Sequence, residues 1–101
     1  MIKLIALYEH PENKEAFDDH YFNVHGPITS KIPGLRKMEV TRIVGSPMGG
    51  EGKYYLQCEM YYDNHEALQA GMRSAEGKAS GKDLMGFAGK LVTLMIGEEV
   101  Q

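Results

Sequence analysis

The sequence lacks the residues from which disulfide-bonded and membrane-spanning proteins are built. Its 101 residues include one cysteine, Cys58, which has no second cysteine in the chain with which to form a disulfide. No apolar run approaches the roughly 20 residues that a membrane-spanning helix needs. The apolar start of the chain reaches Glu9 and His10 too soon for a signal peptide. These absences predict a cytoplasmic protein with no membrane partner.

An excess of basic charge is also missing. The chain has 11 Lys and Arg residues against 14 Asp and Glu residues, and its formal net charge is −3. The densest basic group, Arg36, Lys37 and Arg42, lies on an expected strand and is best explained as a solvated face. Because phosphate recognition requires concentrated Lys and Arg, we expect no nucleic-acid partner.

What the sequence does contain is the ordinary composition of a globular protein. Hydrophobic residues make up 43% and charged residues 25% of the chain. The length suits one domain, residues 1–101. A domain of this size hides only about two-thirds of the surface that its unfolded chain exposes. Its core is therefore thin, and a partner subunit is a plausible source of further burial.

Periodicity and turn residues predict the order strand, helix, strand, strand, helix, strand. Phe17, Tyr21, Val24 and Ile28 form an apolar stripe at helical spacing, and Gly26-Pro27 is expected to break or kink this first helix. The expected strands are residues 2–8, 35–44, 54–62 and 91–96, with a glycine-rich hairpin connection at 45–52. The expected helical segments begin at Pro11, at Glu66 after an Asp63 or Asn64 cap, and at Ala75 after a Ser74 cap.

This order predicts an α+β fold, a ferredoxin-like βαββαβ unit with a four-stranded antiparallel sheet. The first and last strands have apolar residues pointing to both sides, whereas two helices cover only one face of a sheet. The uncovered face would be exposed in a monomer. Pairing two such faces about a two-fold axis encloses a barrel. We therefore expect a homodimeric α/β barrel; the alternative is that the exposed apolar residues are simply tolerated.

His25 is the first candidate catalytic residue. It stands at the end of the first helix, beside Val24 of the apolar stripe and directly before Gly26-Pro27. A histidine at the margin of a buried stripe can face an apolar pocket and act as a general acid or base near neutral pH. The alternative is a structural role. In that role His25 either caps the helix C-terminus, where a cation is favourable, or hydrogen-bonds to a buried carbonyl.

Two further residues complete the candidate site. Asp83 either orients an imidazole or is solvated, and solvation is the expected state. Tyr8 is a candidate donor of a phenol hydrogen bond to a ligand oxygen. Glycines 77, 81 and 86 make the segment 75–88 a weak helix, and such glycines fit where packing is very close or where a pocket needs room.

No metal or cofactor site is predicted. His20 and His25 are five residues apart, so on one α-helix their side chains diverge by about 140° and do not chelate one ion. The sequence also has no glycine-rich phosphate loop and no serine nucleophile elbow.

Two segments, FDDHYFNVHGPITSKIPGLRKMEVTRIVG and SAEGKASGKDLMGFAG, resemble the EthD family, whose proteins are associated with degradation of ethyl tert-butyl ether. The resemblance covers nearly the whole chain. It implies a ferredoxin-like fold, dimeric α/β barrel assembly and, as a rule, no bound metal. The wider group includes muconolactone isomerases and polyketide cyclases, several of which direct a histidine near the end of the first helix into the substrate pocket. His25 stands at the matching place.

These observations lead to the hypothesis of a protein that binds a small hydrophobic organic compound in a catabolic or oxidative degradation pathway. One version is a cofactor-free isomerase, cyclase or lyase acting on a small, mostly apolar carbonyl compound, with His25 moving a proton and Tyr8 bonding an oxygen. A second is a non-catalytic accessory protein or ligand carrier beside a monooxygenase system. A third is a purely structural dimer module. The sequence does not decide whether the protein is an enzyme.

Overall fold

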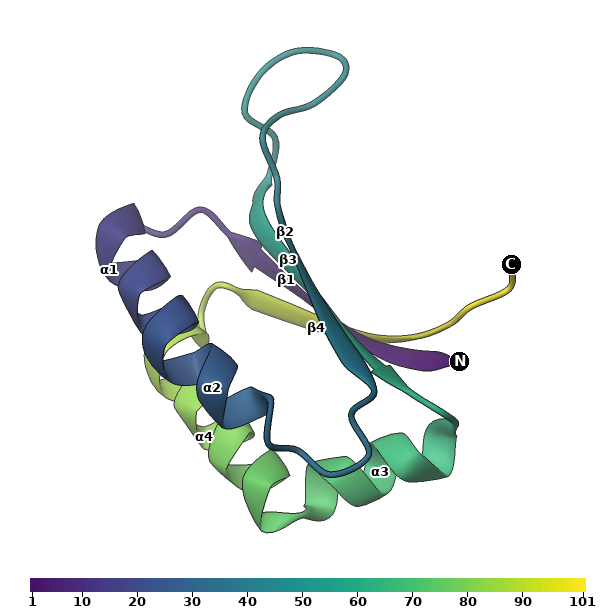
Figure 1. Ribbon diagram of the computed structural model, residues 1–101. Coiled ribbons are helices and arrows are strands. Elements are labelled where there is room, and N and C mark those ends of the chain that lie inside the picture. Colours follow the sequence, from purple (N-terminus) through teal and green to yellow (C-terminus); the bar gives the residue numbers. More distant parts are fainter.

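The computed structural model describes residues 1–101 and arranges them as a sheet with helices packed against one of its faces (Figure 1). None of the helices combines the length and the apolar character that crossing a membrane requires. The elements are, in chain order, β1 (Ile2–Glu9), α1 (Lys14–His20), the π-helical turn η1 (Tyr21–His25), α2 (Gly26–Thr29), β2 (Lys37–Arg42), β3 (Tyr54–Tyr62), α3 (His65–Arg73), α4 (Ala75–Ala88) and β4 (Val92–Glu98).

The sheet confirms the predicted α+β, ferredoxin-like arrangement. Its strand order is β2-β3-β1-β4, and every neighbouring pair is antiparallel. The strands β2 and β3 form the expected hairpin, whose connection projects beyond the end of the sheet (Figure 1). Gly49, Gly50 and Gly52 in this connection have positive φ angles, which glycine adopts without the steric cost that other residues meet.

Side-chain caps explain where three helices begin. Asn13 accepts a hydrogen bond from the Ala16 amide at the start of α1, and Asn64 accepts one from the Ala67 amide at the start of α3. Ser74 accepts from the Gly77 amide and so opens α4 at the predicted position. The same hydroxyl donates to the Gly71 carbonyl at the end of α3. One serine thus separates two consecutive helices.

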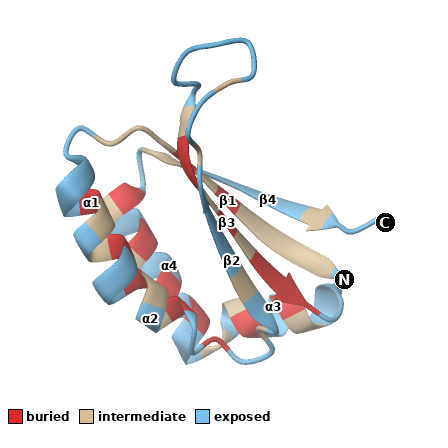
Figure 2. Cartoon of the chain, turned by 45° about the horizontal axis from the view of Figure 1, so that its top comes forward, coloured by how far each residue is buried: buried red, intermediate tan, exposed pale blue.

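The core lies between the sheet and the helices, where the buried residues face one another (Figure 2). Aromatic rings occupy its centre: Tyr8 of β1 meets Phe17 and Tyr21 edge-to-face, at ring-centroid distances of 5.4 and 5.6 Å. Such contacts add stability beyond the area that they bury. The largest fully buried side chains are those of Tyr8, Tyr21, Tyr62, Leu56 and Leu68.

Gly26-Pro27, where a break or a kink was expected, do not break the first helix, because the helical path continues through these residues to Thr29. The amide of Gly26 bonds to the carbonyl of Tyr21, five residues earlier, which defines a π-helical turn. This wider turn ends just before Pro27, the residue whose ring and missing N–H would disrupt a regular α-helical ladder.

The π-helical turn also changes which side of the first helix is buried. The predicted stripe included Val24, but Val24 is 40% exposed, whereas His25 is only 5% exposed. An α-helix drifts by 40° with each step of four residues. An extra residue in one turn compensates for part of this drift. The inward-facing set is therefore Phe17, Tyr21, His25 and Thr29.

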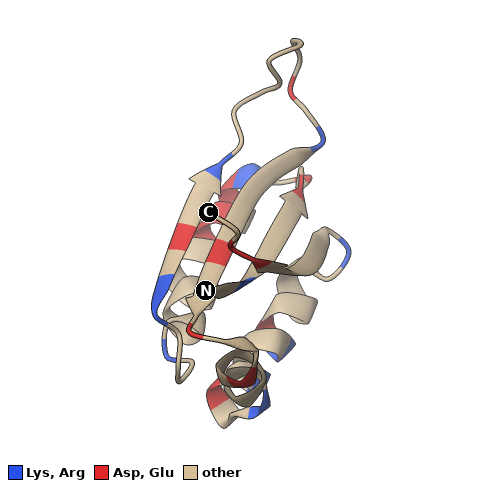
Figure 3. Ribbon diagram, turned by 90° about the vertical axis from the view of Figure 1, so that its right-hand side faces the viewer, with Lys and Arg blue, Asp and Glu red and all other residues tan.

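The sheet face opposite the helices is mostly apolar on the first and last strands, as expected, but it is charged on the other two strands, which corrects the expectation of a wholly apolar face. Pairing register places Ile5 and Leu7 of β1 beside Met95 of β4 on this face. On β2 and β3 the same face is charged (Figure 3). Its polar contacts there are Lys3–Glu59 at 2.6 Å, Tyr61–Glu39 at 2.7 Å and Gln57–Glu59 at 3.2 Å.

Candidate functional site

A cavity of about 80 Å³ lies between the sheet and α4. His25 and Tyr8, two of the residues singled out from the sequence, both line it. The remaining lining residues are mostly apolar side chains and small residues of α4. They are Leu4, Ala6, Ile32, Met60, Met72, Gly77, Ser80, Gly81, Leu84 and Leu94. Leu94 is 45% exposed, so the cavity borders solvent at the outer strand β4.

Two glycines of α4 serve the two purposes expected of them. A Cβ atom on Gly77 would collide with the backbone carbonyls of Gly71 and Met72, so this glycine permits the close approach of α3 and α4. A Cβ atom on Gly81 would meet no atom within 4 Å. Gly81 therefore leaves room in the cavity wall.

Asp83 holds His25 from the side of α4. The Nδ1 atom of His25 is 2.9 Å from Oδ2 of Asp83. An ionised carboxylate only accepts hydrogen bonds, so Nδ1 carries the proton and Nε2 keeps its lone pair. The Asp83 side chain is 19% exposed and lines an open surface hollow, so it also keeps some contact with solvent. Of its two predicted roles, the structure supports the orientation of an imidazole.

The pKa of His25 reflects this setting. Burial lowers its pKa below the ordinary histidine value of 6.5 and is the largest influence. The hydrogen bond to Asp83 acts in the opposite direction, since a nearby carboxylate stabilises the imidazolium. A neutral imidazole whose Nε2 carries no proton is the form that accepts a proton as a general base.

Tyr8 supplies a neutral phenol to the same cavity. Burial raises its pKa well above the usual tyrosine range, with smaller contributions from Cys58 and Asp83. The hydroxyl therefore keeps its proton and remains a hydrogen-bond donor. This placement is consistent with the predicted role of Tyr8 toward a ligand oxygen.

Two hydroxyl groups continue the hydrogen-bonded chain beyond His25. Thr29 Oγ1 lies 3.3 Å from His25 Nε2, one helical turn away, and 2.7 Å from Ser80 Oγ on α4. Ser80 in turn lines the cavity. Sequence reasoning missed both residues. The four-residue spacing of Tyr21, His25 and Thr29 was the available signal for Thr29.

His20 was also missed, because the divergence calculated for His20 and His25 assumed a regular α-helix. The π-helical turn brings residues five apart toward the same side. His20 Nε2 lies 2.9 Å from Asp83 Oδ1, so one carboxylate contacts both imidazoles. The structure contains no group of three or more His, Cys, Asp or Glu side chains arranged to hold a metal ion.

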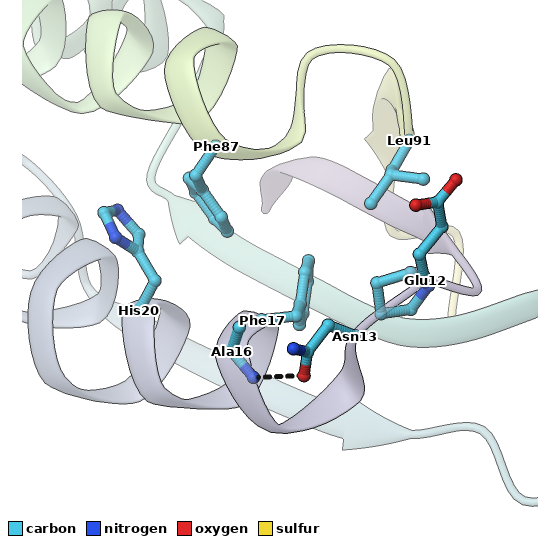
Figure 4. Close-up of a pocket in the computed structure, with 8 residues that line it drawn as sticks. Glu12, Asn13, Ala16, Phe17, His20, Phe87 and Leu91 are labelled. Atoms are coloured by element: carbon cyan, nitrogen blue, oxygen red, sulfur yellow. Dashed lines mark hydrogen bonds between the residues drawn. The ribbon is translucent and has the colours of Figure 1, made fainter.

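His20 faces the outside of the helical layer. A more open hollow of about 390 Å³ lies there, between the start of α1 and the end of α4 (Figure 4). His20 and Phe87 lie beside one another in its wall, with ring centroids 4.4 Å apart. The Asp83 carboxylate therefore stands between an interior cavity lined by His25 and a surface hollow lined by His20.

Comparison with known proteins finds close relatives over nearly the full chain. The EthD domain model matches residues 9–90. The crystal structure of an EthD family protein from Bacillus halodurans is 75% identical, with 99% of each chain covered and a TM-score of 0.96. An uncharacterized 11.0 kDa protein of the thcB-thcC intergenic region of Rhodococcus erythropolis is 26% identical, over 98% of this chain and 95% of its own length.

More distant structures share the fold alone. SnoaB from Streptomyces nogalater, a cofactor-independent oxygenase, is 8% identical with a TM-score of 0.70, over 99% of this chain and 93% of its own. A dimeric ferredoxin-like protein of unknown function from Jannaschia sp. CCS1 is 13% identical with a TM-score of 0.69, over 98% of this chain and 100% of its own.

Proposed function

This chain belongs to the EthD family, and from that premise we propose that it binds a small, mostly apolar carbonyl compound and transfers a proton on it without a cofactor. The observation that carries the proposal is one buried imidazole, His25, in an apolar cavity with its Nδ1 held by Asp83. A carboxylate in this position fixes the tautomer that leaves Nε2 as the base. The reaction class is isomerase, cyclase or lyase.

The proposed chemistry uses the two polar groups of the cavity. Nε2 of His25 takes a proton from carbon next to the carbonyl, and the imidazolium returns it to another position of the compound. The Tyr8 hydroxyl donates a hydrogen bond to the carbonyl oxygen, on which negative charge develops as the proton leaves. SnoaB, which shares this fold, is a cofactor-independent oxygenase, so catalysis without a cofactor occurs on this fold in another protein, although by a different reaction.

The size of the cavity limits the ligand. A volume of about 80 Å³ is well below the roughly 300–1,000 Å³ of sites for drug-sized molecules. The enclosed part therefore suits a compound of few heavy atoms. A longer molecule extends toward solvent past the exposed side of Leu94.

Turnover by His25 variants tests the proposal. We would screen small cyclic enones and lactones by proton NMR, which distinguishes isomers of equal mass, and compare the wild type with His25→Gln. General acid–base catalysis contributes about 10²–10⁴-fold, so His25→Gln should lose a factor in that range. His65→Gln, on the exposed side of α3, is the control and should keep full turnover. Full turnover by His25→Gln on a substrate of the wild type would refute the catalytic role.

The cavity itself favours a second candidate, a non-catalytic carrier, because its lining is predominantly apolar. Gly81→Leu fills the cavity wall, whereas Gly86→Leu places the same side chain on the same helix outside the cavity. Both functions predict that ligand-observed NMR detects binding that Gly81→Leu abolishes and Gly86→Leu preserves. Binding without conversion supports the carrier, and binding retained by Gly81→Leu contradicts both.

We also infer that two chains pair through the sheet face opposite the helices. Ile5, Leu7 and Met95 form an apolar strip there, and Met95 is 41% exposed in the single chain. The dimeric Jannaschia protein shares this fold. Pairing two strips about a two-fold axis would remove apolar surface from water.

A further inference from the structure

Asp83 hydrogen-bonds to a buried and a partly exposed imidazole at the same time. Its Oδ2 is 2.9 Å from Nδ1 of His25. Nε2 of His20 lies between its two oxygens, 2.9 Å from Oδ1 and 3.0 Å from Oδ2. The His20 side chain is 34% exposed, whereas that of His25 is 7% exposed. His20 thus contacts solvent and, through one carboxylate, the interior base.

The other titratable groups around this cluster are neutral or lie at its rim. From inside the core, Tyr21 of η1 packs against the His25 ring, Tyr8 of β1 lines the same cavity, and Cys58 of β3 lies beside Tyr21. Burial raises the pKa of each of these three groups, which keeps them uncharged. From outside, Lys82 of α4 borders the hollow beside His20 and Asp83. Glu12 borders the hollow of about 390 Å³ at the start of α1. Of all these groups, only Asp83 hydrogen-bonds to either imidazole.

We propose that His20 is a positioning residue that sets the proton affinity of His25 through their shared partner, Asp83. A neutral His20 donates its Nε2–H to the Asp83 carboxylate and so fixes the orientation of that carboxylate. The full negative charge of Asp83 is then available to stabilise a His25 imidazolium. When solvent protonates His20, two cations share one carboxylate, and His25 holds a proton less tightly. The inference rests on the proposed function, since it concerns the base of that reaction.

The surrounding electrostatics agree with this direction. Burial is the largest cause of the lowered pKa of His25, the Asp83 contacts raise that pKa, and the charge of His20 lowers it further. A change at His20 should therefore be measurable at His25, although the two rings are not hydrogen-bonded to each other.

Two substitutions separate the positioning from the charge. His20→Gln keeps an N–H that reaches Asp83 but does not titrate, so it preserves the orientation and removes the cation. His20→Phe removes both. His65→Gln, in the exposed part of α3, is the matched control because it deletes another imidazole away from Asp83.

The readout is the ring-nitrogen NMR of ¹⁵N-histidine-labelled protein, titrated with acid alone. In His20→Gln, the pKa of His25 should rise by about half a unit or more, and its titration should become a single step. In His20→Phe, the ring nitrogens of His25 should report a mixture of tautomers in place of Nδ1–H alone. In His65→Gln, the tautomer and titration of His25 should match the wild type.

The proposal is overturned if the tautomer and the titration of His25 are the same in the wild type and in both His20 variants. If His25 stays neutral over the accessible pH range, the tautomer in His20→Phe decides alone. No substrate is needed, so this result is independent of turnover. Turnover that survives His25→Gln refutes the proposed function and leaves the coupling intact, whereas absent coupling refutes only the role of His20.

Discussion

At the residue scale, His25 is a basic group that the fold keeps neutral. Burial lowers its pKa in the folded protein below the value of 6.5 that it has in an unfolded chain. Between these two pKa values, the unfolded chain binds a proton that the folded chain does not bind. Stability therefore rises with pH across this window and falls as the pH drops through 6.5 toward the folded-state pKa.

We predict that His25→Gln reduces this acid sensitivity. The wild type should lose stability as the pH falls below 6.5, and the variant should show a shallower slope because it lacks the titrating ring. Urea unfolding at several pH values measures the slope, which is independent of any constant cost of the substitution. His65→Gln should keep the wild-type slope. Equal slopes in the wild type and His25→Gln would show that other groups cause the pH dependence.

At the element scale, α4 packs closely against α3 at one glycine and leaves space for the cavity at another. Gly77 lies against the carbonyls at the end of α3, whereas Gly81, one turn later, borders the cavity with free space around it. The same helix therefore has one glycine that the packing requires and another that the packing does not require. Intrinsic propensity alone does not separate them, because both glycines weaken a helix equally.

We predict opposite effects for alanine at these two positions. Gly77→Ala should destabilise the protein by about 1–3 kcal/mol or more, since the new methyl group overpacks the contact between α3 and α4. Gly81→Ala should stabilise it by about 0.5–1 kcal/mol, since alanine restricts the unfolded chain and meets no obstacle. Urea unfolding of both variants checks the pair. Effects of the same sign would contradict the assigned roles.

At the scale of the whole molecule, the sheet has two unlike faces. The inner face is covered by helices, and the outer face joins an apolar strip on β1 and β4 to a charged network on β2 and β3. The strip is smaller than the sequence suggested. In the proposed dimer, its charged border, with Lys3 paired to Glu59, would offer polar contacts that specify how two copies align.

We predict that sedimentation of the wild type shows a dimer and that Leu7→Lys shifts it toward the monomer. A lysine in the apolar strip would bury an unpaired charge in the interface, so the dissociation constant should rise by at least about 100-fold. Val44→Lys, in the exposed hairpin connection, is the control and should remain dimeric. A monomeric wild type would contradict the proposed pairing.

Local sequence features determined the order of the elements. The asparagine and serine caps, the glycine-rich connection and the apolar strands depend on neighbours in the chain, so residues 54–62 and 75–88 were predicted with the observed bounds. His25 and Tyr8 were identified as candidates for the same reason, since each lies on an apolar segment near a predicted turn. The resemblance of two segments to the EthD family raised the interest of His25.

Only the tertiary structure decided how these candidates combine. Asp83 lies 58 positions from His25 and 63 from His20, and no local pattern specifies a contact over such a separation. The π-helical turn, which rotates His25 inward and leaves Val24 outside, depends on a five-residue hydrogen bond that helical periodicity does not reveal. Both features depend on how α1, η1 and α2 pack against α4. This packing selects one backbone geometry among several that the local sequence does not distinguish.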